Sequence, residues 1–261
     1  MKIKFLFTFI LFASGLLMQA QDFSLYQKKW FGIDKDKLPY RILMPLDFDS
    51  TKIYPVIFML HGSGERGSDN ELQLVHGAKL FLNNEIRKNY PAIVVFPQCP
   101  INDSWINSRD KNDRSGKGKI VFFDAAPATK AMQHLQKFVQ FILQEYPAKK
   151  DQVYVGGLSM GGMGTFDLVS RMPKTFAAAF PICGGANPAI AKKINNTKWW
   201  IFHGAKDDVV LPQYSSIMAN ALKAAKASVK FTLYPDANNN SWDAAFAELE
   251  LLPWLFAQIK K

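Results

Sequence analysis

A serine between glycines is the feature of this sequence that most directly indicates chemistry. Residues 157–161 read GLSMG, a G-x-S-x-G pattern, and they follow the apolar run VYV at residues 153–155. Where such a pentapeptide joins a strand to a helix, its glycines permit a sharp turn that exposes the serine hydroxyl above a sheet. The N–H groups at the start of the following helix stabilise negative charge that develops nearby. The pattern therefore predicts that Ser159 is a nucleophile.

A second glycine-rich segment offers the donors that such a nucleophile needs. Residues 60–67 read LHGSGERG and form the end of an apolar run. Glycines free the backbone here to direct an N–H group toward the serine, and two converging donors stabilise the oxyanion of an attacked carbonyl. We expect the backbone amides of Ser63 and Met160 to be this pair. The alternative is a glycine-rich turn with no chemical role.

A third segment carries candidate acids. Residues 202–210 read FHGAKDDVV and come directly after another apolar run. A carboxylate at this point fits the chain order of serine, acid and histidine that accompanies a serine on this kind of turn. Asp207 and Asp208 are both candidates from position alone. His203 is either a catalytic base or a packed, hydrogen-bonded residue at the end of a strand.

These residues require a scaffold in which several strands end at one edge of a sheet. Apolar runs of strand length alternate with segments of helical spacing, without repeats or low-complexity linkers, so one α/β domain is expected over residues 21–261. The polar residues 102–119 are expected to form either a functional or mobile loop or a solvated insertion. The expected strands are residues 38–44, 54–60, 92–97, 152–156, 177–182, 199–202 and 229–234, and the expected helices are residues 125–146, 161–172, 213–227 and 242–259.

Together these motifs resemble the α/β-hydrolase superfamily, specifically secreted bacterial esterases related to phospholipase/carboxylesterase and dienelactone hydrolase, sometimes labelled predicted peptidases. The resemblance covers nearly the whole chain after residue 20, and it implies a mostly parallel central sheet flanked by helices, with no cofactor. In such families the acid is the aspartate of an H-G-x-x-D run, which corresponds to Asp207, and the nucleophile corresponds to Ser159. The matching stretches are residues 60–67, 97–100, 157–162, 181–185, 203–207 and 234–242.

One position departs from the pattern of the family. Relatives carry the catalytic histidine in a Y-P-x-x-x-H-x-S-W segment, whereas residues 234–242 read YPDANNNSW, so Asn239 stands at the histidine position. An amide has no basic nitrogen and cannot accept the serine proton. The chain contains four histidines, and none of them follows Asp207 in the sequence; they are His61, His76, His134 and His203.

Three interpretations of Asn239 remain open at this point. The protein is a natural pseudoenzyme, or it carries a substitution in an otherwise active enzyme, or another histidine, His61 or His203 first, acts as the base. The function expected from the resemblance is that of a carboxylic-ester hydrolase with weak or lost activity. The alternative is a catalytically dead protein of the same fold that binds an ester or glycan ligand. Acyl, feruloyl, acetyl-sugar and short peptide-like esters are all compatible with the sequence.

The first twenty residues are expected to be a signal peptide. Lys2 and Lys4 precede an apolar run from Phe5 to Met18, and Ala20 offers a small residue for cleavage. This run is shorter than the ~20 residues of a membrane-spanning helix, so no stable membrane anchor is expected after export to the periplasm or the exterior. Removal of the two lysines lowers the net charge from +10 to +8. The remaining lysines are dispersed, which argues against nucleic-acid binding.

Metal sites and disulfides are not expected either. No pair of histidines or carboxylates has the spacing of metal ligands beside an open site, and no P-loop motif is present, so neither a metal nor a nucleotide cofactor is expected. By analogy with the strand order of the superfamily, the strands that end near Cys99 and Cys183 flank two others. Three strand spacings of ~4.8 Å exceed the ~7 Å that a disulfide tolerates. Both cysteines are therefore expected to be free, buried thiols.

Overall fold

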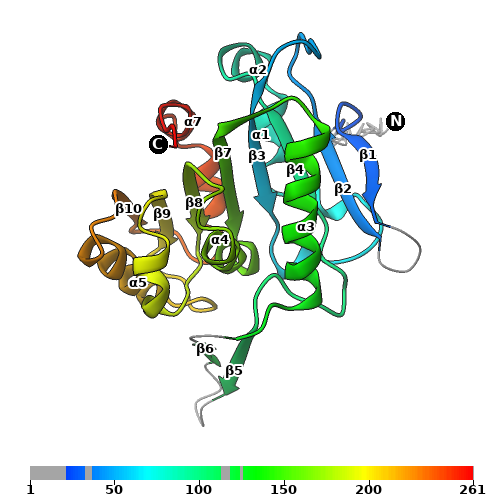
Figure 1. The fold of residues 1–261 in the computed structure, drawn as a ribbon. Helices are drawn as coiled ribbons and strands as arrows, with labels where there is room; N and C mark the ends of the chain where they lie inside the picture. The colour runs from blue at the N-terminus through cyan, green and yellow to red at the C-terminus, as the bar shows by residue number, and fades with distance from the viewer. Residues whose placement is uncertain (1–21, 33–36, 113–117, 124–125, 261) are drawn as a thin grey trace, which may run out of the picture.

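A sheet of eight strands forms the centre of the structure, a computed structural model that describes residues 22–32, 37–112, 118–123 and 126–260 (Figure 1). The strand order is β1-β2-β4-β3-β7-β8-β9-β10. The pairs β1–β2 and β2–β4 are antiparallel and all other neighbours are parallel, which confirms the expected α/β-hydrolase fold with a mostly parallel sheet. The strands are β1 (Gln27–Phe31), β2 (Leu38–Leu43), β3 (Tyr54–Leu60), β4 (Ile93–Pro97), β7 (Ala148–Leu158), β8 (Ala178–Ile182), β9 (Lys198–Gly204) and β10 (Val229–Tyr234).

Both faces of the sheet are buried, which explains why its central strands are almost entirely apolar. Successive side chains of a strand point to opposite faces. In β3, Phe58 and Leu60 therefore belong to one hydrophobic cluster, whereas Ile57 and Met59 belong to another. The adjacent tryptophans of residues 199–200 are divided between the two clusters in the same way.

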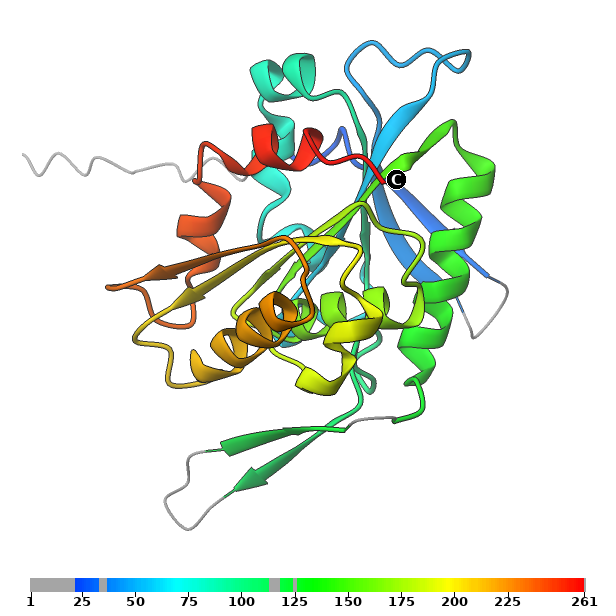
Figure 2. The ribbon, with the colours of Figure 1, turned by 60° about the vertical axis from the view of Figure 1, so that its left-hand side comes forward.

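Helices cover the two faces separately (Figure 2). On one face, Leu135, Phe166 and Met218 represent α3, α4 and α5 in the first cluster, and the buried side chains of α3 recur at helical spacing. On the other face, α1, α2, α6 and α7 pack against the second cluster. The helices are α1 (Ala78–Leu82), α2 (Asn84–Asn89), α3 (Lys130–Glu145), α4 (Met160–Arg171), α5 (Gln213–Ala224), α6 (Trp242–Phe246) and α7 (Leu251–Phe256).

The polar stretch expected to be a loop contains a second, two-stranded sheet. β5 (Ser108–Asn112) and β6 (Gly118–Phe122) pair antiparallel and project away from the main sheet in both ribbon views (Figures 1 and 2). The segment lacks an alternation of apolar and polar residues, which is the pattern that identifies a half-buried strand. The expectation of a loop over residues 102–119 was therefore wrong for these two strands.

Two further expectations differ from the structure. Residues 242–259 form two short helices, because the Pro253 ring excludes the helical hydrogen bond to residue 249 and clashes with that carbonyl. The first helix ends at Phe246 and the second begins at Leu251. The edge strand β1 was not expected, since its sequence QKKWF is mostly polar and largely exposed.

Within the described residues, no helix combines the length and apolar content needed to cross a membrane. The same part of the chain holds no group of three or more His, Cys, Asp or Glu side chains able to bind a metal ion. The expected signal peptide, residues 1–20, lies outside the described residues. It therefore stays a prediction from the sequence.

Both cysteines are buried and free, as expected. Cys99 follows β4 and Cys183 follows β8, and the strands β3 and β7 lie between β4 and β8. Burial raises the pKa of both thiols, that of Cys183 to about 12. Neither thiol is therefore ionised at neutral pH, and the reactive thiolate form is absent.

We expect a thiol reagent such as Ellman's reagent to react very slowly with the native protein. After unfolding in denaturant without a reducing agent, the two thiols present in the sequence should react fully. Absorbance at the end of each reaction measures the number of thiols. A denatured, unreduced sample with no reactive thiol would show that the cysteines are paired.

Candidate active site

Ser159 occupies a strained turn between β7 and α4. Its backbone angles are φ 52° and ψ −117°, a conformation that side-chain-bearing residues rarely adopt. A Cβ atom on Gly161 would lie 2.0 Å from the carbonyl oxygen of Leu60, so only glycine fits at this position. Ser159 is partly exposed, whereas its neighbours Leu158 and Met160 are buried. The turn therefore presents the serine and conceals the residues on either side of it.

The glycine-rich segment after β3 lies against this turn. β3 and β7 are adjacent parallel strands in which Leu60 pairs with Gly157, so both strands end at the same level. Ser63 and Met160 are each the first residue of a helical turn, where a backbone N–H has no partner within the helix. Among the described residues, neither amide donates a hydrogen bond to another group. Both amides are therefore available as donors.

Asp207 is a buried carboxylate surrounded by donors. Its Oδ1 accepts hydrogen bonds from the amides of Val209 at 2.9 Å and Val210 at 2.8 Å. Its Oδ2 accepts a hydrogen bond from Asn239 Nδ2 at 2.9 Å and lies 3.2 Å from His203 Nε2. Burial acts to raise the pKa of Asp207, but these donors outweigh it and hold the pKa below its usual value of 3.8. Asp207 is thus a stable carboxylate at neutral pH.

The loops after β9 and β10 bring Asp207 and Asn239 together. Lys206 N donates to the carbonyl of Ala237 at 2.9 Å, and a Cβ atom on Gly204 would lie 2.3 Å from the carbonyl oxygen of residue 238. The neighbouring Asp208 is exposed, whereas Asp207 is only 3% exposed. Among the described residues no hydrogen bond joins the Ser159 hydroxyl to Asn239.

The ring nitrogens of His61 are engaged within its own surroundings. Nδ1 donates to the carbonyl of Gly62 at 2.6 Å, and Nε2 accepts from the amide of Cys99 at 2.9 Å. Burial lowers the pKa of His61 to about 4, although its hydrogen bond to the backbone acts in the opposite direction. This ring is therefore neutral and has a partner on each nitrogen, and within the described part of the chain no hydrogen bond joins it to the Ser159 hydroxyl.

His203 is likewise engaged on both ring nitrogens. Nδ1 lies 2.7 Å from Ser215 Oγ, and Nε2 lies 2.7 Å from the carbonyl oxygen of Val210. The side chain is completely buried. Among the described residues no contact joins this ring to the Ser159 hydroxyl, so its neighbour in the site is the carboxylate and not the serine.

Two groups near the site were not identified from the sequence. His76 Nε2 lies 3.6 Å from Glu65 Oε1, and its ring packs on Trp242 with centroids 5.0 Å apart, so the glycine-rich segment is linked to the helix that follows Asn239. Cys183 directly follows Ile182, whose carbonyl accepts from Ser159 N at 2.9 Å. These contacts join residues far apart in the chain, and no local motif signals them.

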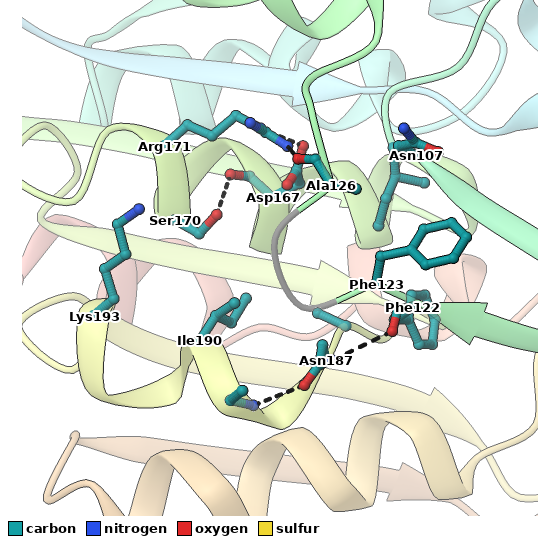
Figure 3. A pocket seen from close by; sticks show the side chains of 13 residues that line it. Asn107, Phe122, Phe123, Ala126, Asp167, Ser170, Arg171, Asn187, Ile190 and Lys193 are labelled. Carbon is teal, nitrogen blue, oxygen red and sulfur yellow. Dashed lines mark hydrogen bonds and ion pairs between the residues drawn. The ribbon is translucent and has the colours of Figure 1, made fainter.

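A cavity of about 380 Å³ lies beside α4 (Figure 3). Asp167 and Arg171 of α4 form an ion pair of 2.8 Å in its wall, and burial raises the pKa of Asp167 despite this pair. Phe122 lies at one end of the cavity and Lys193 at the other. Ser159 is not among the lining residues. Asp167 lies eight residues further along the chain, which corresponds to about 12 Å along the helix axis. The cavity therefore lies to one side of the turn at Ser159.

Comparison with known proteins identifies the family. The model of the Phospholipase/Carboxylesterase family matches residues 49–250, well over half of the chain. The chain belongs to this family.

Solved structures of esterases resemble this family member over most of its length. A thermostable esterase is 31% identical with a TM-score of 0.79, and the match covers 90% of this chain and 64% of that one. A feruloyl esterase module from Clostridium thermocellum, complexed with sinapinate, has a TM-score of 0.64 at 17% identity, over 90% of this chain and 89% of the module. At that identity the second likeness shows the fold alone.

A curated relative matches over a shorter stretch. The bifunctional acetylxylan esterase/xylanase of Neocallimastix patriciarum is 34% identical over 83 residues, which are 31% of this chain and 12% of that protein. The chain therefore spans less than two thirds of this relative and of the thermostable esterase. The match concerns a segment of the relative, and its whole activity does not transfer with it.

We expect Gly204→Ala to destabilise the protein by about 1–3 kcal/mol, because the added Cβ would lie 2.3 Å and 2.4 Å from two backbone oxygens of the Asn239 loop. Gly64→Ala is the matched control, since a Cβ there has no neighbour within 4 Å. Its effect should stay within about 1 kcal/mol. Urea denaturation measures both; equal stabilities would show that the contact between the loops does not constrain position 204.

We also expect His61 to contribute about 2 kcal/mol less to the free energy of unfolding at pH 5 than at pH 7, because the unfolded chain binds a proton that folded His61 excludes. The pKa of His61 is 6.5 when unfolded and about 4 when folded, so this stability is lost as the pH falls through that window. His61→Gln retains a donor and an acceptor and should remove this part of the slope. His134→Gln on α3 should leave the slope unchanged, and an unaltered slope in His61→Gln would contradict the assignment.

Proposed function

We propose that Ser159, Asp207 and the amides of Ser63 and Met160 form the site of a carboxylic-ester hydrolase whose general base is replaced by Asn239. The observation that carries this proposal is the 2.9 Å hydrogen bond from Asn239 Nδ2 to Asp207 Oδ2. In the esterases that this chain resembles, the imidazole of the catalytic histidine makes this contact with the acid. The amide reproduces the contact and lacks the basic nitrogen.

The proposed chemistry is acyl transfer through Ser159. Its hydroxyl oxygen attacks the ester carbonyl carbon, and the amides of Ser63 and Met160 stabilise the oxyanion that forms. The alcohol leaves, and water then releases the acyl group from the serine. Asp207 would orient a base and stabilise its positive charge while the base carries the serine proton.

Replacement of the base decides how fast this chemistry runs. Removal of the histidine from a serine hydrolase costs on the order of a million-fold in turnover. The oxyanion donors and the binding pocket retain roughly a thousand-fold acceleration over water. We therefore expect slow residual ester hydrolysis, far below that of an esterase with a complete set of catalytic groups.

A non-catalytic binding protein is the second candidate function. Its support is that four donors already surround the Asp207 carboxylate, so the site needs no base to be stably folded. In this role the same site would hold an ester or glycan ligand without turning it over. The two candidates differ in covalent reactivity at Ser159 and in whether activity returns with a base.

We propose an ester of a carbohydrate as the substrate class. The acetylxylan esterase/xylanase provides the support, since its name describes acetyl esters of the polysaccharide xylan, and the name of the feruloyl esterase module describes feruloyl esters. The cavity beside α4 offers space for a part of such a molecule that does not react. We also propose export from the cell, on the basis of the basic start and the apolar run in residues 1–20.

We expect Asn239→His to raise the turnover of a short-chain p-nitrophenyl ester by at least ~10³-fold over the parent, because the remaining catalytic groups are already present. Asn238→His is the matched control, since the Asn238 side chain accepts from the backbone of Asn240 and makes no bond to Asp207. Addition of Ser159→Ala to the active variant should abolish the gain.

A fluorophosphonate probe gives a second measurement of the same proposal. The parent should label slowly and Asn239→His rapidly, since deprotonation of Ser159 limits the reaction. Fast labelling and efficient ester turnover by the parent would show that another group acts as the base. An inert Asn239→His variant, together with ligand binding by the parent, would favour the binding protein.

A further inference from the structure

A buried chain of contacts leads from the candidate acid to α5 and the end of β8. His203 lies in this chain, with Nε2 3.2 Å from Asp207 Oδ2 and 2.7 Å from the Val210 carbonyl oxygen. Its Nδ1 lies 2.7 Å from Ser215 Oγ, which donates to the carbonyl of Gly184 at 2.7 Å. His203 and Ser215 are both fully buried. Both ring nitrogens therefore have partners within the protein.

The positions of the hydrogens in these contacts around His203 follow from which groups can only accept. The carbonyl of Val210 and the ionised carboxylate of Asp207 only accept, so Nε2 must carry a hydrogen. The single hydrogen of the Ser215 hydroxyl is used on the Gly184 carbonyl, so Oγ must accept a hydrogen from Nδ1. If the hydroxyl turned toward the ring instead, two oxygens would lie 2.7 Å apart without a hydrogen between them. Both ring nitrogens of His203 therefore carry hydrogens.

We propose that His203 is a positively charged positioning residue that holds the Asp207 carboxylate and weakens the base at position 239. The part that concerns the base rests on the proposed function, in which Asp207 orients the group at that position. A cation beside the carboxylate compensates part of its negative charge. Less negative potential then remains at Oδ2 to stabilise a second imidazolium, that of a histidine at position 239 bound to the same oxygen atom.

The other groups around His203 do not alter this balance. Cys183, at the end of β8, is neutral at pH 7 because burial raises its pKa to about 12. Tyr234, in the neighbouring strand β10, packs on Phe202 and so lies on the other face of the sheet from His203. Ser215 and the carbonyl of Val210 are uncharged. Among the described residues, Asp207 is the one charged side chain that pairs with the ring.

Nitrogen-15 NMR of the histidine rings tests the charge directly. The sequence contains four histidines, so spectra of His61→Gln, His76→Gln and His134→Gln assign three signals and leave that of His203 as the fourth. His203 is expected as a ring protonated on both nitrogens at pH 7.5, and His61 as a neutral ring. A neutral tautomer for His203 at that pH would overturn the proposal, and this measurement requires no substitution at the site.

The influence on position 239 is tested in the Asn239→His background. There, His203→Gln replaces the cation by a neutral donor, and the titration midpoint of the introduced imidazole should rise by about one pH unit. His134→Gln, made in the same background, is the matched control and should leave the midpoint unchanged. An unchanged or lower midpoint with His203→Gln would contradict the proposal, because a purely structural role predicts no rise.

This titration is read by NMR and does not depend on turnover, so the two proposals can fail separately. If Asn239→His stays inactive but its midpoint rises with His203→Gln, the role of His203 stands and the proposed esterase function is wrong. If Asn239→His is active, the pH profile of kcat/KM should shift by the same amount as the NMR midpoint. Activity without any shift would remove His203 from this role.

Discussion

A buried carboxylate stays ionised only where donors replace the water that it has lost, and in this chain that requirement falls on Asp207. Its two oxygens receive the amides of Val209 and Val210 on one side and the side chains of Asn239 and His203 on the other. These donors come from the segments after β9 and β10 and from β9 itself. The carboxylate therefore fixes two loops relative to the sheet, whatever chemistry they perform.

This requirement explains why an asparagine is structurally acceptable at position 239. An amide nitrogen and the N–H of an imidazole both donate to a carboxylate oxygen, so either satisfies Asp207. They differ at the far side of the residue, where an imidazole has a basic nitrogen and an amide does not. The contribution of residue 239 to folding and its contribution to catalysis are thus separable. Stability alone does not favour histidine over asparagine here.

The motifs with local geometry could be predicted from the sequence, and the contacts between distant segments could not. The strand, turn and helix around Ser159 follow from residues 153–161, because glycine spacing and apolar periodicity are local signals. The β5–β6 pair lacks such a signal. The contact of His76 with Trp242 joins segments far apart in the chain and depends on how the fold brings them together. Position alone left Asp207 and Asp208 equivalent, and burial distinguishes them.

The turn at Ser159 is independent of the residue at position 239. Its positive φ costs of order 1–3 kcal/mol and persists only where surrounding contacts impose it. Those contacts are the approach of Gly161 to the backbone of β3 and the hydrogen bond from Ser159 N to Ile182. None of them involves the loop that carries Asn239. Ser159 is therefore positioned by the sheet edge and Asp207 by its own donors. In the proposed site, the missing base is then a local defect, because the other parts of the site are held separately.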